Sequence, residues 1–203
     1  HQEQYMPVAQ LEVLRRSRLK KLFQFSKTST HFYKSFNNYE ELPVLTKDMI
    51  IKRFNDFFST KDKRSLVKKT TGGSTGVPFA FSTTRRSVSY MWAGIILSWE
   101  ATGYRIGDKV VLLAGSSLFK NDWKHKLFYK LLNVDILYAS PLSDEIIEGY
   151  AERIKKDKAA VVYGYSYAIN TVAEYLNRVK KHQFPDLKGV VCTAELLTES
   201  ARA

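Results

Sequence analysis

The run TTGGSTGVPF, residues 70–79, is the part of the sequence best suited to chemistry. Its three glycines permit positive φ angles, so successive amide N–H groups can converge on an anion. The hydroxyls of Thr70, Thr71, Ser74 and Thr75 add donors, and no bulky side chain blocks a close approach. The pattern indicates either a phosphate-binding loop or a glycine-rich turn between two antiparallel strands, and by itself it leaves both open.

Other catalytic patterns are absent or weaker. No Lys-Ser or Lys-Thr follows Gly76, as a Walker A loop requires, and the glycines are not spaced as GxGxxG. The segment AGSSLF lacks the G-x-S-x-G turn of serine hydrolases. The histidines are far apart and share no spacing with acidic residues, so we predict no metal-binding cluster.

The elements that must position the loop change character near residue 65. Residues 1–65 are predicted to form a helical N-terminal segment, and residues 66–203 an α/β nucleotide-binding subdomain truncated at its C-terminus. Apolar residues at mixed helical spacings predict an amphipathic helix from Val8 to Phe25. Thr46 is a suitable N-cap for a helix that begins at Lys47.

Strands and helices alternate after residue 65. Strands are expected at 66–70, 78–82, 109–114, 134–138, 160–163 and 189–192. Helices are expected at 84–102, 121–132, 143–156 and 166–181. This alternation predicts βαβ crossovers and a mostly parallel sheet, hence an α/β fold. The apolar run Met91–Trp99 is interpreted as a core helix, because it is about half the length that crosses a bilayer.

The chain is basic, with 32 Lys and Arg against 20 Asp and Glu. Such a surface could attract nucleic acid, an anionic membrane surface or a polyphosphate ligand, or could simply be solvated. No known nucleic-acid-binding motif accompanies it, which makes nucleic acid the less favoured partner. The single Cys192 excludes a disulfide framework, and we expect a cytoplasmic protein without a membrane span.

The string TTGGSTGVP resembles the signature loop of adenylate-forming enzymes. Further blocks follow in the family's order: ELPVLTK before the loop, then GYRIGDKVVLLAG, VVYGYSYAI and LKGVVCTAE after it. Together they look like the branch of phenylacetate–coenzyme A ligases and capsular polysaccharide biosynthesis proteins, from about Leu11 to the end of the chain. The resemblance implies part of the N-terminal domain of such a ligase.

The family's reaction activates a small-molecule carboxylate with ATP, and passes the acyl-adenylate to coenzyme A or another acceptor. By position, six loop residues would surround the β- and γ-phosphates: Thr71, Gly72, Gly73, Ser74, Thr75 and Gly76. Lys47 occupies the lysine position of the LP-x-x-x-K block, which implies a catalytic place near the phosphates. Alternatively, Lys47 is an exposed lysine in the first turn of a helix.

Two later blocks imply the rest of the pocket. Tyr163, Gly164, Tyr165 and Ser166 would border the substrate, or would be only a buried strand end with a glycine turn. The pair Ala194-Glu195 matches a block that borders the adenine. Its position after a strand agrees with this, because ligands gather at the carboxyl ends of parallel strands. Alternatively, Glu195 is an acid in the first turn of a helix.

Several blocks of the family have no counterpart in the sequence. They are the Tyr-Gly-x-Thr-Glu block with its Mg²⁺ ligand, the ribose-binding Asp, the hinge and the C-terminal domain. Since TAELLTESARA has barely begun a helix when the chain stops, we expect an incomplete fragment with an incomplete Mg²⁺ site. We also expect no carboxylate-dependent pyrophosphate exchange by this chain alone. The alternatives are a basic nucleic-acid-binding module or a non-catalytic nucleotide-binding relative, and the oligomeric state stays open.

Overall fold

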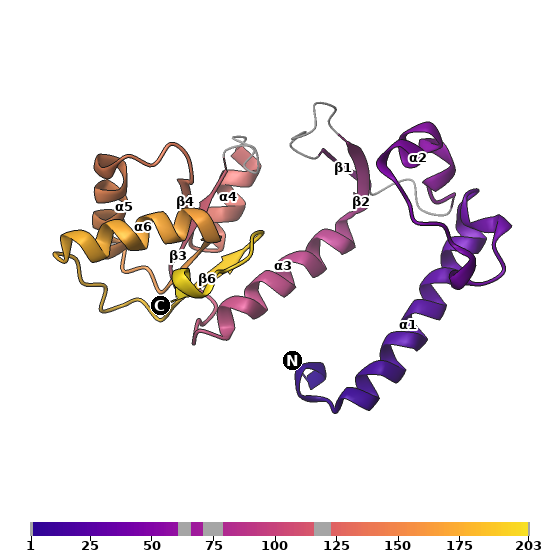
Figure 1. Ribbon diagram of the computed structural model, residues 1–203, viewed down its shortest axis with the longest axis horizontal. Helices are drawn as coiled ribbons and strands as arrows, with labels where there is room; N and C mark the ends of the chain where they lie inside the picture. Colours follow the sequence, from indigo (N-terminus) through magenta and orange to yellow (C-terminus); the bar gives the residue numbers. More distant parts are fainter. Residues whose placement is uncertain (1, 61–65, 71–78, 116–122, 203) are drawn as a thin grey trace. The chain divides into compact units, whose positions relative to one another are not determined.

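The computed structural model describes residues 2–60, 66–70, 79–115 and 123–202 (Figure 1). Contacts within the chain divide it into two compact units, His1–Met91 and Trp92–Ala203. The division falls inside helix α3 (Arg85–Glu100). The boundary predicted near residue 65 coincides with residues 61–65, which are outside the described residues, so it stays a prediction.

The first unit is helical, with one antiparallel pair of strands. Its elements before α3 are η1 (Gln2–Tyr5), α1 (Val8–Ser29), η2 (Tyr33–Ser35), η3 (Tyr39–Glu41), α2 (Lys47–Lys52), η4 (Phe54–Phe57), β1 (Leu66–Thr70) and β2 (Ala80–Thr84). As predicted, Thr46 caps α2, because its hydroxyl accepts a hydrogen bond from the amide of Met49 at 3.2 Å. The amphipathic face expected on α1 is only partly right, since Phe23 is buried while Val8 and Leu22 are exposed.

A small aromatic core holds the segments after α1 together. Phe32 is buried and stacks on Phe57, with ring centroids 4.3 Å apart. The guanidinium of Arg53 lies 5.0 Å from the Phe32 ring centroid. The amide of Phe32 donates to the carbonyl of Asp56 at 3.0 Å. These contacts connect Arg53 and η4 with the segment that follows α1, and thereby join the chain on both sides of α2.

The second unit is built on a four-stranded parallel sheet in the order β4-β3-β5-β6. Its elements after α3 are β3 (Val110–Ala114), α4 (Trp123–Leu131), β4 (Val134–Tyr138), α5 (Asp144–Lys156), β5 (Val161–Tyr165), α6 (Ser166–Val179), β6 (Gly189–Thr193) and α7 (Glu199–Arg202). The α/β fold with a mostly parallel sheet is confirmed, and the antiparallel pair β1–β2 is separate from it.

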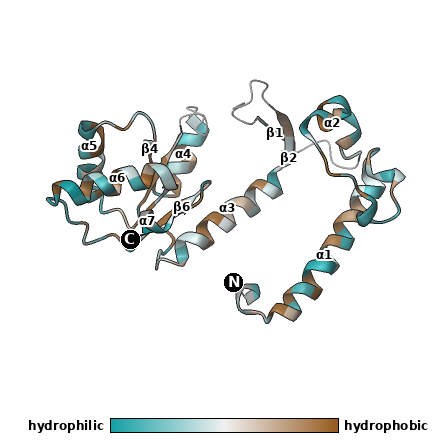
Figure 2. Cartoon of the chain, viewed as in Figure 1, coloured by the Kyte–Doolittle hydropathy of each residue, from teal (hydrophilic) through white to brown (hydrophobic). Residues whose placement is uncertain are grey.

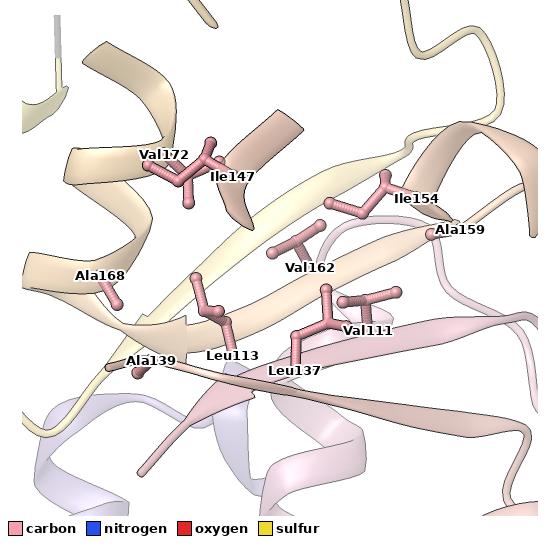
Figure 3. Close-up of a cluster of buried hydrophobic side chains, with 10 residues drawn as sticks. All are labelled: Val111, Leu113, Leu137, Ala139, Ile147, Ile154, Ala159, Val162, Ala168 and Val172. Atoms are coloured by element: carbon pink, nitrogen blue, oxygen red, sulfur yellow. The ribbon is translucent and has the colours of Figure 1, made fainter. Parts of the chain in front are cut away.

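Side chains that alternate along the central strands pack into two clusters, one on each face of the sheet. On one face, Val111 and Leu113 of β3 meet Ile147 of α5 and Val172 of α6 (Figure 3). On the other face, neighbouring residues of the same strands meet Trp99, which is fully buried at the end of α3. The interpretation of Met91–Trp99 as a core helix is confirmed for the turns from Trp92 onward. Among the described residues, no helix is both long and apolar enough to cross a membrane.

Candidate functional site

The glycine-rich loop is carried on an antiparallel hairpin. Strands β1 and β2 pair from Leu66 opposite Thr84 to Thr70 opposite Ala80, so the last pair stands directly before the loop. The loop residues Thr71 to Gly76 lie outside the described residues, and their phosphate-binding role stays a prediction. A glycine-rich turn would also connect two antiparallel strands, so the stem does not distinguish a phosphate-binding loop from a plain turn.

Two cations that the sequence motifs did not single out lie in the stem. Lys68 and Lys69 directly precede Thr70, and strand alternation directs their side chains to opposite faces of the hairpin. Lys68 is exposed, and the ammonium of Lys69 lies 3.9 Å from the sulfur of Met91. The pair brings positive charge to the base of the loop, and the signal that could have found it is the string KKTTGG.

Lys47 is the first residue of α2 and is half-buried. The Thr46 cap defines where α2 begins, and therefore fixes the backbone from which this side chain extends. The interpretation of Lys47 as an exposed first-turn lysine is right about its place in the helix and overstates its exposure. Its catalytic role stays a prediction.

In the second unit, the block 163–166 ends β5 and begins α6. Gly164 is opposite Leu113 of β3, and a Cβ on it would lie 2.2 Å from the Leu113 carbonyl oxygen and 2.9 Å from the Leu113 Cβ. Tyr163 is half-buried, and its ring meets that of Trp99 in an edge-to-face arrangement with a centroid distance of 5.8 Å. Gly164 is therefore required by strand packing, whatever else the block does.

Glu195 joins the carboxyl ends of β5 and β6. Its carboxylate accepts a hydrogen bond from the amide of Tyr167 at 2.8 Å, and its carbonyl accepts one from the buried Ser166 hydroxyl at 3.1 Å. Tyr165, the N-cap residue of α6, makes no side-chain cap of its own. Glu195 therefore caps α6 from the neighbouring strand end, where a negative charge also suits the helix dipole. The alternative of a first-turn helix acid is wrong, because the next helix begins at Glu199.

Ala194, the residue before Glu195, has a φ of 69°. Residues other than glycine adopt this left-handed conformation infrequently, and such backbone gathers at ligand-binding sites. Ala194 is exposed. The structure thus brings Ser166 and the pair 194–195 together at one edge of the sheet. Their roles toward substrate and adenine stay predictions.

Two pockets in the described part of the second unit do not involve these residues. A larger, open pocket of about 640 Å³ is lined by residues of β4 and α5, among them Tyr138, Glu145 and Arg153. The other is a cavity of about 100 Å³. It lies between the sheet and helices α5 and α6, and apolar side chains line it, among them Leu137, Ile154 and Leu176. Among the described residues, no group of three or more His, Cys, Asp or Glu side chains could hold a metal ion. We therefore assign no ligand to Mg²⁺.

No family model matches the chain. It is 28% identical to "Protein CapK" of Staphylococcus aureus over 207 residues, which are 93% of this chain and 45% of CapK.

The fold is similar to that of a 2-hydroxyisobutyryl-CoA ligase. The open conformation of that enzyme, in complex with 2-HIB-AMP and CoA, matches with a TM-score of 0.64 and 20% identity over 94% of this chain and 49% of the ligase. Its postadenylation state, with R3-HIB-AMP, matches with a TM-score of 0.58 and 20% identity over 86% of this chain and 40% of the ligase. The chain spans about half the length of these relatives. It has the fold of part of an adenylate-forming ligase, and the resemblance that the sequence motifs indicate is confirmed at that level.

Proposed function

We propose that the chain is part of an ATP-dependent ligase that activates a small-molecule carboxylate as an acyl-adenylate. A carboxylate oxygen of the substrate attacks the α-phosphorus of ATP, the bond to the bridging oxygen of the β-phosphate breaks, and pyrophosphate leaves with the electron pair. A nucleophile, which we take to be the thiol of coenzyme A, then attacks the acyl carbon, and AMP leaves. The resemblance of the motif blocks to capsular polysaccharide biosynthesis proteins, together with the similarity to CapK, supports a place in surface or capsular polysaccharide biosynthesis.

The observation that carries the proposal is the order of the motif blocks on this fold. The loop of residues 71–76 follows a hairpin stem that brings Lys68 and Lys69 to its base, where positive charge favours a triphosphate. Lys47 would add a cation to the departing pyrophosphate, on which negative charge accumulates. Mg²⁺ would enter with the triphosphate and offset the same charge.

The carboxyl ends of β5 and β6 would bind the nucleoside and the carboxylate. Ala194 is exposed and left-handed beside Glu195, and parallel sheets bind ligands at this edge. The Glu195 carboxylate already accepts the Tyr167 amide, so its role toward adenine would be to hold the backbone of residues 194–195 in place. The end of β5 and the first residue of α6, from Tyr163 to Ser166, would border the carboxylate substrate. ATP and coenzyme A are both cytoplasmic, which supports a cytoplasmic location for the protein.

Calorimetric titration of ATP into the 203-residue chain tests the loop. We expect the double variant S74A/T75A to lower the affinity for ATP by about tenfold, because two hydroxyl donors to a charged phosphate are lost. The double variant S35A/S89A removes two exposed hydroxyls from the same unit and should bind ATP as the unchanged chain does. Equal affinities for all three proteins would show that the loop is only a turn.

A further inference from the structure

Helix α4 presents apolar side chains to the solvent. Trp123, Leu127 and Leu131 follow one another at intervals of four residues, so they lie on one face of the helix. Their exposed fractions are 70%, 48% and 76%. We call these three residues the α4 ridge. Figure 2 shows hydrophobic and hydrophilic residues next to each other along this helix.

The ridge points away from the side of α4 that packs on the protein. Tyr129 packs against the cluster around Trp99, and its ring centroid lies 6.1 Å from that of Trp92. By helical geometry, Tyr129 is on the opposite side of the helix from Leu127. A surface helix of a globular protein ordinarily has its apolar stripe on the inside. Helix α4 therefore has a second apolar face, which the described residues of the unit leave largely exposed.

Lysines border the ridge on both sides. Lys126 and Lys130 flank it on one side and Lys124 on the other, and all three are exposed. The ammonium of Lys124 lies 5.7 Å from the centroid of the Trp123 ring. Helix α4 contains no acidic residue. An apolar stripe between cationic borders is complementary to a surface that is apolar inside and anionic at its edge.

We propose that α4 docks the chain on an anionic membrane surface, with its axis parallel to the bilayer. The ridge would enter the boundary between headgroups and acyl chains, where tryptophan is favoured, and the lysines would contact anionic headgroups. This docking is independent of the nucleotide chemistry proposed above. It would hold a ligase beside substrates or acceptors that belong to the membrane.

Size and chemistry favour a bilayer over a macromolecular partner. A helix of nine residues is about 13 Å long. Its face offers far less than the roughly 800 Å² per partner that a stable protein interface buries. Nucleic acid would use the lysines and could stack on Trp123, but it offers nothing apolar to Leu127 and Leu131. A bilayer uses all six side chains of the ridge and its borders.

Vesicle sedimentation of the whole 203-residue chain tests the proposal. We expect binding to vesicles that contain phosphatidylglycerol and phosphatidylcholine in roughly equal amounts, and little binding to pure phosphatidylcholine. The variant K126Q/K130Q should lose about 25-fold in affinity, since each lysine near an anionic surface contributes about fivefold. The variant L127S/L131S should lose at least about tenfold.

Matched control variants distinguish binding through the α4 ridge from effects of overall charge and of exposed apolar side chains in general. K155Q/K156Q removes two exposed lysines from the end of α5, and I106S removes an exposed apolar side chain from a turn. Both should bind vesicles as the unchanged chain does. Equal losses in the ridge variants and in these controls would overturn the proposal.

A second measurement needs no variant of the ridge leucines. Trp99 is buried and Trp92 half-buried, so acyl chains carrying bromine should quench chiefly Trp123, and W123F should remove most of that quenching. Absence of quenching in bound protein would overturn the proposal. So would a dimer, or retention of an RNA oligonucleotide, that requires the ridge while vesicles are not bound.

Discussion

Gly164 of β5 is paired with Leu113 of β3. The Leu113 carbonyl oxygen occupies the space that a Cβ would need, and this oxygen belongs to the backbone of the central strand. Gly149, in the middle of α5, is the opposite case, because an added Cβ there would meet nothing within 4 Å. Strand packing therefore requires a glycine at position 164, whereas packing places no such requirement on position 149.

We expect Gly164→Ala to lower the free energy of unfolding by about 3 kcal/mol, because β3 and β5 would have to separate locally. Gly149→Ala should instead raise it by about 0.5–1 kcal/mol, because alanine is the better helix former. Urea unfolding followed by circular dichroism measures both. A neutral Gly164→Ala would mean that the strand ends move apart easily, and the block 163–166 would lose its structural explanation.

At the scale of elements, α5 and α6 are joined by polar contacts around Glu148. Its carboxylate accepts hydrogen bonds from the Tyr175 hydroxyl at 2.7 Å and from the His182 ring at 3.0 Å, and pairs with the Lys181 ammonium at 2.6 Å. Hydrogen bonds from Lys181, Tyr175 and His182 lower the pKa of Glu148 to about 2. The bond to the same carboxylate raises the pKa of Tyr175 to about 12.

The lowered pKa of Glu148 predicts a pH-dependent stability. The ionised form is favoured in the folded state, so its contribution is complete above the ordinary value of 4.5 and is lost as the pH falls toward about 2. We expect Glu148→Gln to lower the melting temperature at pH 6, with a difference from the unchanged chain that shrinks between pH 4.5 and 2.5. Glu152→Gln, at an exposed position of α5, is the control. A difference that stays constant over this range would exclude the carboxylate as its cause.

Local patterns predicted most elements, and long-range contacts account for what they missed. The ranges 66–70 and 134–138 match β1 and β4, because short β-rich runs and turn residues mark such strands. The N-cap at Thr46 is likewise a local signal. In contrast, Glu195 caps α6 across 28 residues, and Gly164 is needed because of Leu113. Neither requirement leaves a local pattern in the sequence.

The candidate site, too, could be predicted from the sequence only in part. The order of the motif blocks along the sequence predicted the fold, which the comparisons confirm. The contact between Ser166 and Glu195 follows from the parallel pairing of β5 and β6. The sequence motifs could not reveal that the Ser166 hydroxyl already has an acceptor. They predicted a helix at 121–132 but not the exposed apolar face of α4, because an apolar residue in a sequence does not show on which side of a helix the protein lies.

At the scale of the whole molecule, the residues that the proposed function assigns to phosphate and those that it assigns to the nucleoside belong to different units of the chain. The first unit carries the phosphate loop and Lys47, and the second carries the strand ends at Ser166 and residues 194–195. The fragments of ATP can therefore report on each unit separately. Pyrophosphate should depend on the first unit, AMP on the second, and ATP on both.

We expect Lys47→Ala to weaken the binding of ATP and of pyrophosphate by about tenfold, because a charge-assisted contact to phosphate is lost, and to leave the binding of AMP unchanged. Lys52→Ala removes a lysine from the last turn of the same short helix and should change none of the three affinities. Calorimetric titration of each ligand, at fixed ionic strength, measures the effects. Equal weakening of ATP by both variants would indicate a general effect of positive charge. Weakened AMP binding in Lys47→Ala would contradict the assignment of Lys47 to the β- and γ-phosphates.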